Sequence, residues 1–387
     1  MPNYSKLKID ASGRKEPQLT CITEGNTLYD WASMATYSSA FSLSSTGSSS
    51  GPSLSDLEYA IGSIKSNSGV VGYRNLLSYA SSLGLKVFPK SSFDIDAWTK
   101  LGSGSYSITW KAEIIDQQGV VVAIKQPNGS FTRESTDVED SLQHEALTSI
   151  IQEIRILANP KLKAHPNLPH IIGVFFQEEA DPVGIRPCVL FDLALSDLRQ
   201  YLINKQLNGI PVEEMTKLAL HIANGIGALH ACGIVHGDVK PENVLLFMRD
   251  GILTATVADL GTCGIPSQAS GVITGSLNYC APEYFQRSPH AEEVNQPPRD
   301  VYNYGMVLWS IMTFCKEDPF SQENRFEIQH DERLAVESIL SRVPNDSMNS
   351  TFKKLIQECL KPNPKHRPSI FEVSWSLEPD STKTQVP

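Results

Sequence analysis

A short stretch between two apolar runs contains several charged and polar side chains of the kinds that catalyse reactions. Residues 236–243 read HGDVKPEN, and Asp259 follows sixteen residues after Asn243. A carboxylate such as Asp238 can accept a proton from an attacking hydroxyl, and Lys240 can neutralise charge on a group being transferred. Asn243 and Asp259 supply hard oxygen ligands of the kind that Mg²⁺ prefers. The stretch therefore predicts a site that handles a metal-bound phosphate, with the rest of the chain as its support.

Residues 236–243 resemble the catalytic loop of protein kinases, H-R-D-x-K-x-x-N, and the tripeptide Asp-Leu-Gly at 259–261 resembles their metal-binding D-F-G turn. The resemblance extends over about residues 98–372. It implies an α+β, bilobal fold, with an antiparallel sheet plus one helix in the N-lobe and a mainly helical C-lobe. It also implies ATP and Mg²⁺ as cofactors, with Asp238 as the proton acceptor and with Asn243 and Asp259 as the metal ligands.

Two positions depart from the family pattern, Gly237 in place of Arg and Leu260 in place of Phe. H-G-D-x-x-x-x-N is also the loop of small-molecule kinases that resemble aminoglycoside and choline phosphotransferases, which gives one alternative. A catalytically weak pseudokinase scaffold that keeps the fold as a binding module gives another. In kinases with arginine at the position of Gly237, the guanidinium adds positive charge beside the catalytic Asp, and a phosphate on the activation loop offsets that positive charge. Gly237 removes this guanidinium. We therefore expect activity without phosphorylation of the candidate loop sites, which are Ser267, Ser270 and Thr274.

A glycine-rich segment and a strand that ends in lysine precede this stretch. Residues 101–109 read LGSGSYSIT and resemble the phosphate-covering loop G-x-G-x-x-G-x-V. Residues 121–125 resemble the strand V-A-I-K, whose lysine holds two phosphates of ATP. Residues 188–198 resemble the hinge between lobes, where Phe191 would border adenine. The resemblance assigns nucleotide contacts to Leu101, Gly102, Ser103, Gly104, Ser105, Thr109, Ala123, Lys125, Asp192, Ala194, Asp197 and Leu245.

In this family a glutamate on the next helix holds the lysine, and this chain offers Glu145 and Glu153. Apolar residues recur at helical spacing over residues 142–157. Glu153 has the family's spacing from the following turn His-Pro-Asn at 165–167, whereas Glu145 lies about 12 Å away along a helix that rises 1.5 Å per residue. We predict that Glu153 pairs with Lys125.

The C-terminal half carries further motifs. Residues 275–283 resemble the end of the kinase activation segment, G-T-x-x-Y-x-A-P-E, which small-molecule kinases generally lack. Asp300 begins an apolar helix, and Arg367 resembles the late arginine that pairs with the glutamate of A-P-E. The resemblance thus assigns catalysis to Asp238, Lys240, Lys125 and Glu153, metal binding to Asn243 and Asp259, and structural roles to His236, Glu283, Asp300 and Arg367.

Changes in composition along the 387 residues suggest how the chain is divided. Serine-rich residues offer little apolar surface to offset the entropy of ordering, which predicts a disordered tail. Helical periodicity begins at residue 53, ahead of the kinase-like part. The expected regions are a tail at 1–52, a helical extension at 53–97, a kinase domain at 98–375 with lobes meeting at 191/192, and a polar tail at 376–387.

Bulk properties narrow the choice of partners. The formal net charge of −10 argues against nucleic-acid binding, which depends on clustered Lys and Arg. Seven scattered cysteines without a C-x-x-C motif suit reduced thiols, and no apolar run approaches the roughly 18 residues that span a bilayer. We expect a soluble cytoplasmic or nuclear signalling kinase that phosphorylates Ser or Thr in protein substrates. The N-terminal helices offer a site for a regulatory partner.

Overall fold

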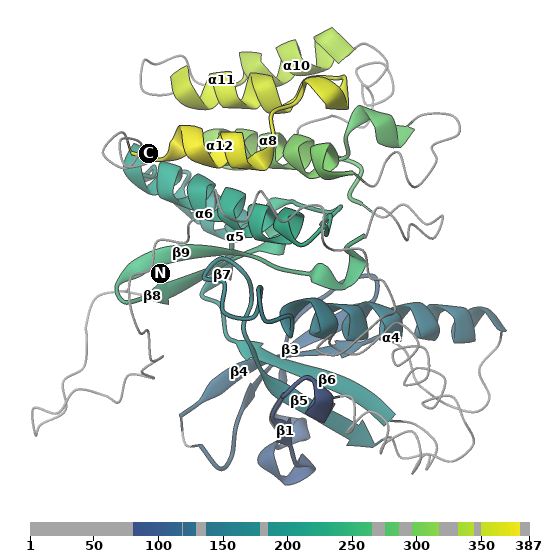
Figure 1. Ribbon diagram of the computed structural model, residues 1–387. Coiled ribbons are helices and arrows are strands. Elements are labelled where there is room, and N and C mark those ends of the chain that lie inside the picture. The colour runs from purple at the N-terminus through teal and green to yellow at the C-terminus, as the bar shows by residue number, and fades with distance from the viewer. Residues whose placement is uncertain are drawn as a thin grey trace, which may run out of the picture.

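The computed structural model describes residues 80–117, 119–128, 137–178, 185–264, 275–285, 296–316, 332–343 and 350–379. Figure 1 shows two lobes, one built on a sheet with a long helix beside it and one built mainly of helices, which confirms the expected bilobal α+β fold. Several predictions concern residues outside the described ranges: the tail at 1–52, the helices over 53–79, the loop sites at 265–274 and the last residues, 380–387.

Six strands form the N-lobe sheet in the order β1-β5-β6-β4-β3-β2. Neighbouring strands are antiparallel, except that β1 runs parallel to β5. Val122 and Ile124 show no exposed surface, as expected for alternate residues on the covered face of a sheet. The strands are β1 (Val87–Phe88), β2 (Thr99–Ser103), β3 (Ser107–Glu113), β4 (Val121–Pro127), β5 (Ile171–Glu178) and β6 (Ile185–Asp192).

The described part of the expected helical extension, residues 80–97, is only briefly helical. A helix ends at Ser82, and the chain then forms β1 and two 3₁₀ turns, η1 (Lys90–Ser92) and η2 (Ile95–Ala97). β1 approaches β5 so closely that a Cβ at Gly173 would lie 2.5 Å from the Lys86 carbonyl oxygen. The end of the extension therefore adds an edge strand to the sheet of the kinase-like part.

The helix α4 (Asp137–Leu157) is the one that carries Glu153. Its apolar residues Ile150, Ile151 and Ile154 are buried in a cluster with Val174 of β5 and Ala80 of the N-terminal segment. Leu83, Leu85 and Val87 pack against the same cluster. Apolar contacts with both the N-terminal segment and the sheet thus hold α4 in place.

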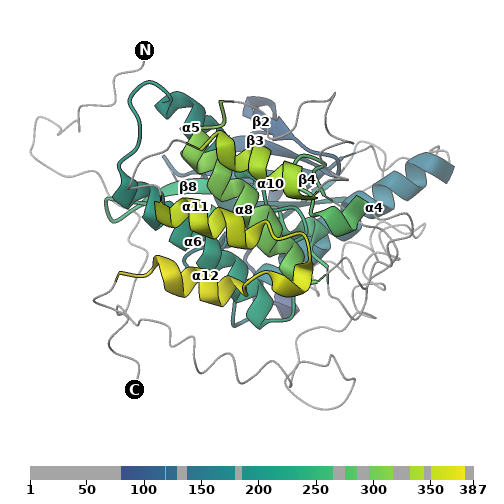
Figure 2. The same ribbon diagram turned by 90° about the horizontal axis from the view of Figure 1, so that it is seen from above.

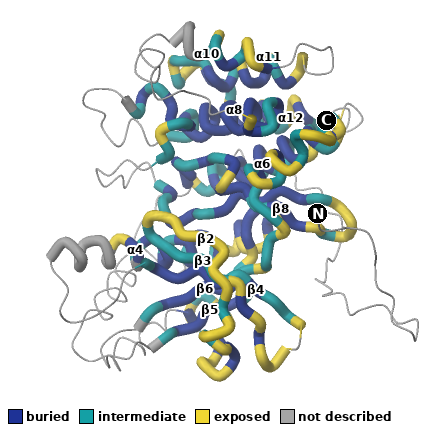
Figure 3. Tube along the Cα trace, turned by 180° about the vertical axis from the view of Figure 1, so that it is seen from behind, coloured by how far each residue is buried: buried dark blue, intermediate teal, exposed yellow. Residues whose placement is uncertain are grey.

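The C-lobe consists of stacked helices around α8, as the view from above in Figure 2 shows. Residues on all sides of α8 are buried, in agreement with its apolar sequence, and Figure 3 shows it as a dark blue core element. The described helices of this lobe are α5 (Leu198–Lys205), α6 (Val212–Ala231), α8 (Pro297–Thr313), α10 (Glu332–Ser341), α11 (Ser350–Cys359) and α12 (Ile370–Leu377). Among the described helices, none combines the length and the apolar character needed to cross a bilayer.

A small sheet lies where the two lobes meet. Its strands β7 (Ser196–Asp197), β8 (Val244–Arg249) and β9 (Ile252–Val257) are antiparallel in that order. Short 3₁₀ turns precede β8 and follow β9 at the end of the hairpin that faces the cleft. The described 3₁₀ turns of the C-lobe are η3 (Pro241–Asn243), η4 (Leu260–Thr262), η6 (Pro282–Phe285) and η8 (Pro364–His366).

Candidate active site

The β8–β9 hairpin brings the two polar segments of the sequence together. Asn243 directly precedes β8, Asp259 follows two residues after β9, and Val244 pairs with Val257 at the shared end of the strands. A backbone hydrogen bond from the amide of Ala258 to the carbonyl of Asn243 (2.8 Å) continues the pairing past the strands. Antiparallel register therefore places the carboxamide and the carboxylate on the same side of the cleft.

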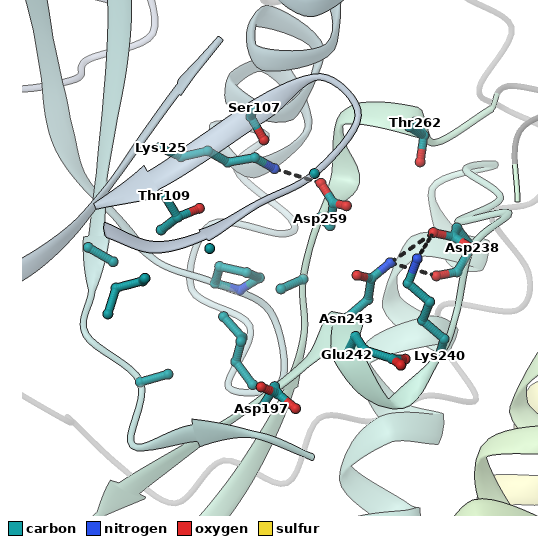
Figure 4. A pocket seen from close by; sticks show the side chains of 18 of the residues that line it. Ser107, Thr109, Lys125, Asp197, Asp238, Lys240, Glu242, Asn243, Asp259 and Thr262 are labelled. Atoms are coloured by element: carbon teal, nitrogen blue, oxygen red, sulfur yellow. Dashed lines mark hydrogen bonds and ion pairs between the residues drawn. The ribbon is translucent and has the colours of Figure 1, made fainter. Parts of the chain in front are cut away.

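Three hydrogen bonds hold the side chain of Asp238, in the loop between α6 and β8. Its Oδ1 accepts a hydrogen bond from the amide of Ser276 (2.7 Å), and its Oδ2 accepts from Lys240 Nζ (2.7 Å) and Asn243 Nδ2 (3.1 Å). Lys240 also donates to the hydroxyl of Ser276 (2.6 Å). Figure 4 shows Asp238, Lys240 and Asn243 converging on one point. These contacts fix the orientation of a carboxylate that lines an open cleft.

Lys125 lies across the cleft in β4, between two carboxylates. Its Nζ is 2.7 Å from Glu153 Oε2 and 2.6 Å from Asp259 Oδ1. Burial disfavours the charged amine, but the two carboxylates outweigh it and raise the pKa of Lys125. The same contact with Lys125 lowers the pKa of Asp259. Lys125 and Asp259 are therefore both charged at neutral pH.

The helix register predicted from the sequence is confirmed at this ion pair. Glu153 is buried and reaches Lys125, whereas Glu145 is exposed. Glu153 Oε1 also accepts a hydrogen bond from the amide of Leu260 (3.3 Å), so α4 contacts the turn that carries Asp259. At Gly261 a Cβ would lie within 2.9 Å of the Ser149 backbone, which explains why glycine is needed there.

A cleft of about 1190 Å³ lies between the lobes. Its lining includes every residue that the sequence assigns to catalysis, nucleotide contact or metal binding, from Leu101 on β2 to Asp259 after β9. Residues that line the cleft but were not predicted include Tyr106, Pro169, His170, Glu242, Phe247 and Thr262. The motifs thus found the groups assigned to catalysis and metal binding but missed other parts of the cleft wall.

Asn128 was also missed, although it supports the glycine-rich loop. Its side-chain Nδ2 donates to the carbonyl oxygens of Gly104 (2.8 Å) and Ser105 (2.9 Å). Its backbone amide donates to the carbonyl of Tyr106 (2.8 Å). These bonds tie the loop tip to the end of β4. No sequence signal marks this role, because a single asparagine after a strand commonly indicates a turn.

Asp300, at the start of α8, is completely buried and holds the catalytic loop by its backbone. Its carboxylate accepts hydrogen bonds from the amides of His236 (2.8 Å) and Gly237 (2.7 Å) and contacts His230 Nε2 (2.8 Å). Burial raises the pKa of Asp300, but the bonds from His230 and the loop outweigh it and leave the pKa below its ordinary value. The His236 ring lies 2.9 Å from the carbonyl of Ala258, which links the loop to the segment before Asp259.

Glu283 and Arg367 form the ion pair expected from the two C-lobe motifs. Arg367 Nη1 and Nη2 each donate to one oxygen of Glu283 at 2.7 Å. The guanidinium also donates to the carbonyl oxygens of Pro298, Lys361 and Pro362. The pair lies away from the cleft lining and fastens the segment after residue 275 to the C-lobe.

Although Gly237 stands in place of the family's arginine, the catalytic loop still has a guanidinium beside it. Arg299, the residue before Asp300, places its guanidinium there, with Nη2 donating to the carbonyl of Gly237 (2.7 Å). Arg299 is 2% exposed. The prediction that activity does not need phosphorylation of the loop sites stays a prediction, because Ser267, Ser270 and Thr274 lie outside the described residues.

Comparison with known proteins agrees with this geometry. The family model described as protein kinase domain matches residues 96–376. The chain is 24% identical over 305 residues to the serine/threonine-protein kinase mos of Patiria pectinifera. The aligned residues cover 76% of this chain and 77% of that protein. It is 27% identical over 283 residues to the serine/threonine/tyrosine-protein kinase HT1 of Arabidopsis thaliana, covering 72% and 64% of the two chains.

A third relative has a different description. The chain is 26% identical over 291 residues to the dual specificity protein kinase zak2 of Dictyostelium discoideum, covering 70% of this chain and 42% of that protein. The chain therefore spans less than two thirds of the length of HT1 and zak2.

Proposed function

This chain belongs to the protein kinase family, and we propose that it transfers the γ-phosphoryl group of ATP to serine and threonine hydroxyls of signalling proteins. One observation carries the proposal: the carboxylate of Asp238 is held by Lys240, Asn243 and Ser276, across the cleft from the ion pair of Lys125. Phosphoryl transfer depends on positioning and on charge stabilisation, and these groups supply both.

Asn243 and Asp259 are suited to hold Mg²⁺. Asn243 uses its Nδ2 on Asp238, and Figure 4 shows its carboxamide oxygen on the side away from Asp238. The side chain of Asp259 is 43% exposed although Lys125 occupies one of its oxygens. Hard, accessible oxygens of this kind match the preference of the ion. When bound, Mg²⁺ would offset negative charge on the phosphates of ATP.

Side chains and backbone groups of the protein would bind the phosphates, the adenine and the acceptor hydroxyl. Lys125 would bind the α- and β-phosphates, with Glu153 holding the lysine in place. The backbone of Asp192–Ala194 would bind adenine, and Gly102 and Gly104 would let the loop approach the phosphates. Asp238 would orient the acceptor hydroxyl and accept its proton at a carboxylate oxygen, and Lys240 would offset charge on the phosphoryl group.

The choice of serine and threonine as acceptors rests on Lys240 and Ser276. Lys240 stands two residues after Asp238 and donates to the Ser276 hydroxyl, a combination that resembles Ser/Thr kinases. Because zak2 is described as a dual specificity kinase, tyrosine is the second candidate acceptor. A peptide array that presents Ser, Thr and Tyr in matched contexts distinguishes these two specificities.

The pseudokinase and small-molecule alternatives make different predictions. Leu260, one of the departures that favours a scaffold, is fully buried and donates its amide to Glu153, so the turn keeps its contact with α4. The paired Glu283 and Arg367 favour a protein kinase over an aminoglycoside or choline kinase, which generally lacks A-P-E. Phosphorylation of amino sugars or choline but not peptides would favour the small-molecule alternative, and no ATP turnover would favour the scaffold.

The experiment measures MgATP-dependent phosphorylation of the peptide array by wild type and Asp238→Asn. We expect wild type to label Ser and Thr peptides. Asp238→Asn should lose about 10²- to 10⁴-fold in kcat, the usual contribution of a positioned acid or base, while circular dichroism and melting temperature stay near wild type. A folded Asp238→Asn protein with wild-type turnover would contradict the assignment.

A further inference from the structure

Two glycines far apart in the sequence lie against the same buried guanidinium. A Cβ placed at Gly237 would lie 3.4 Å from Arg299 Nη1, and one at Gly275 would lie 2.7 Å from Arg299 Nη2. A Cβ at Gly275 would also lie 3.2 Å from the carbonyl oxygen of Gly237. Both glycines have φ in the region that L side chains rarely adopt, +78° and +150°. The guanidinium of Arg299 therefore lies where the catalytic loop meets the segment that begins at residue 275.

Each side of this junction leads directly to the proposed proton acceptor. Gly237 precedes Asp238, and Gly275 precedes Ser276, whose amide donates to Asp238 Oδ1 (2.7 Å). Arg299 donates to the carbonyl of Gly237, while its neighbour Asp300 accepts from the amide of the same residue. Successive residues at the start of α8 thus hold the two ends of the Gly237 main chain.

The guanidinium at this junction is buried and lies beside an aromatic ring. Arg299 is 2% exposed, and its guanidinium carbon lies 5.7 Å from the centre of the Tyr284 ring. A buried guanidinium is costly unless its donors are used, whereas a flat group of this kind fits between a carbonyl and a ring. An ammonium would keep the charge but lose the planar fork.

We propose that Arg299 is a positioning residue that locks Asp238 to Ser276, supplying from α8 the guanidinium that Gly237 lacks. The inference rests on the proposed kinase function. Arg299 acts through the backbone of Gly237 and through Gly275, from behind the residues that line the cleft. Because its guanidinium is buried, the lock does not require a phosphate bound to Arg299.

The test compares Arg299→Gln and Arg299→Lys with wild type, all expressed with a phosphatase and shown by mass spectrometry to lack phosphate. We expect Arg299→Gln to lower kcat for a Ser peptide more than tenfold, with Arg299→Lys in between. The KM for ATP should change less than twofold, because the lining of the cleft includes Lys125 and Asp259 but not Arg299. A general loss of structure would change both constants, so this split distinguishes positioning from scaffolding.

The exposed Arg342, at the end of α10, provides the matched control, since Arg342→Gln also removes one arginine from the C-lobe. Its kcat and KM should equal those of wild type. If Arg299→Gln does not fold, the folded Arg299→Lys protein decides: a kcat at least threefold lower with an unchanged KM for ATP supports the lock. A folded variant at position 299 with kcat within twofold of wild type overturns it.

Gly275→Ala tests the junction from its other side and keeps the proposal testable if neither Arg299 variant folds. The added methyl group would press on Nη2 of Arg299, so kcat should again fall more than tenfold with little change in the KM for ATP. Wild-type kcat in Gly275→Ala overturns the lock. A wild type that phosphorylates no peptide would instead refute the proposed function, so the two failures can be told apart.

Discussion

Within the described part of the chain, two of the buried ion pairs differ in what else their charged groups contact. Arg367 and Glu283 meet through two bonds of 2.7 Å, and three backbone carbonyls take the other donors of the guanidinium. Lys125 instead shares its one ammonium group between Glu153 and Asp259, and the side chain of Asp259 is 43% exposed to the cleft.

This difference separates a pair that stabilises the fold from one that is available for binding. The hydrogen bonds of the Arg367 guanidinium go to other parts of the C-lobe, so they hold segments together. The ion pair of Lys125 opens onto solvent on the Asp259 side, where a ligand with negative charge can enter. Both pairs are buried, so burial alone does not show which pair serves catalysis.

The largest expected effect comes from breaking the C-lobe pair. Arg367→Gln leaves the Glu283 carboxylate buried without its cation, which should lower the free energy of unfolding by about 3–5 kcal/mol. Urea denaturation followed by tryptophan fluorescence measures this loss. Replacing both partners, as in Glu283→Gln with Arg367→Gln, should cost less than the sum of the two single changes. Equal stability of Arg367→Gln and wild type would contradict the structural role.

The cleft pair should give the opposite result, a loss of activity with little loss of stability. Lys125→Met and Asp259→Asn each remove a charge that we assign to the phosphates or their metal, so kcat/KM should fall about 10²- to 10³-fold. Asp259→Asn should also weaken the dependence of nucleotide binding on Mg²⁺, measured by titration calorimetry. A melting temperature that falls as far as in Arg367→Gln would contradict the contrast between the pairs.

Within the cleft, Glu153 is expected to matter less than Lys125, because it acts by holding the lysine. Glu153→Gln should lower kcat/KM by roughly 10- to 100-fold, or about 1.4–2.7 kcal/mol of barrier. Glu145→Gln on the same helix is the matched control and should be close to wild type, since Glu145 is exposed. A crippled Glu145→Gln beside a normal Glu153→Gln would contradict this assignment.

The sequence predicted the parts of this site that lie within one motif. Asp238, Lys240 and Asn243 occupy a single loop, and the short step to Asp259 is a hairpin whose register follows from antiparallel pairing. The partner of Lys125 was also predictable, because the distance of Glu153 along the chain from the turn at residue 165 matches the spacing that the resemblance to kinases implies. In these cases local spacing carried the information.

The sequence did not reveal contacts that exist only after folding. Arg299 is adjacent in space to Gly237 and Gly275, but 62 and 24 residues away in the chain. The strand β1 is two residues long, too short to show an alternating pattern. Both features depend on glycines that let another segment come close to the backbone. A glycine in the sequence permits such a contact but does not indicate which segment will make it.

His165 is a third buried titratable group, and burial alone lowers its pKa. At Lys125, by contrast, the neighbouring carboxylates raise the pKa by more than burial lowers it. It lies in the turn between α4 and β5, where Nδ1 accepts a hydrogen bond from the amide of Asn167 (3.2 Å). Burial lowers the pKa of His165 to about 4 from an ordinary value of 6.5. The folded protein therefore keeps this ring neutral at pH values at which the unfolded chain protonates it.

The sign of the effect follows from proton binding. Between about pH 6.5 and 4 the unfolded state binds a proton at His165 that the folded state does not, so lowering the pH favours unfolding. One pKa unit corresponds to 1.36 kcal/mol, which gives about 2 kcal/mol of lost stability between pH 7 and pH 5. His165→Gln should remove this contribution, so its unfolding free energy should fall less steeply over that range, even if it is lower at pH 7. The exposed His366 supplies the control variant, and a slope for His165→Gln equal to those of wild type and His366→Gln would show that burial does not hold His165 neutral.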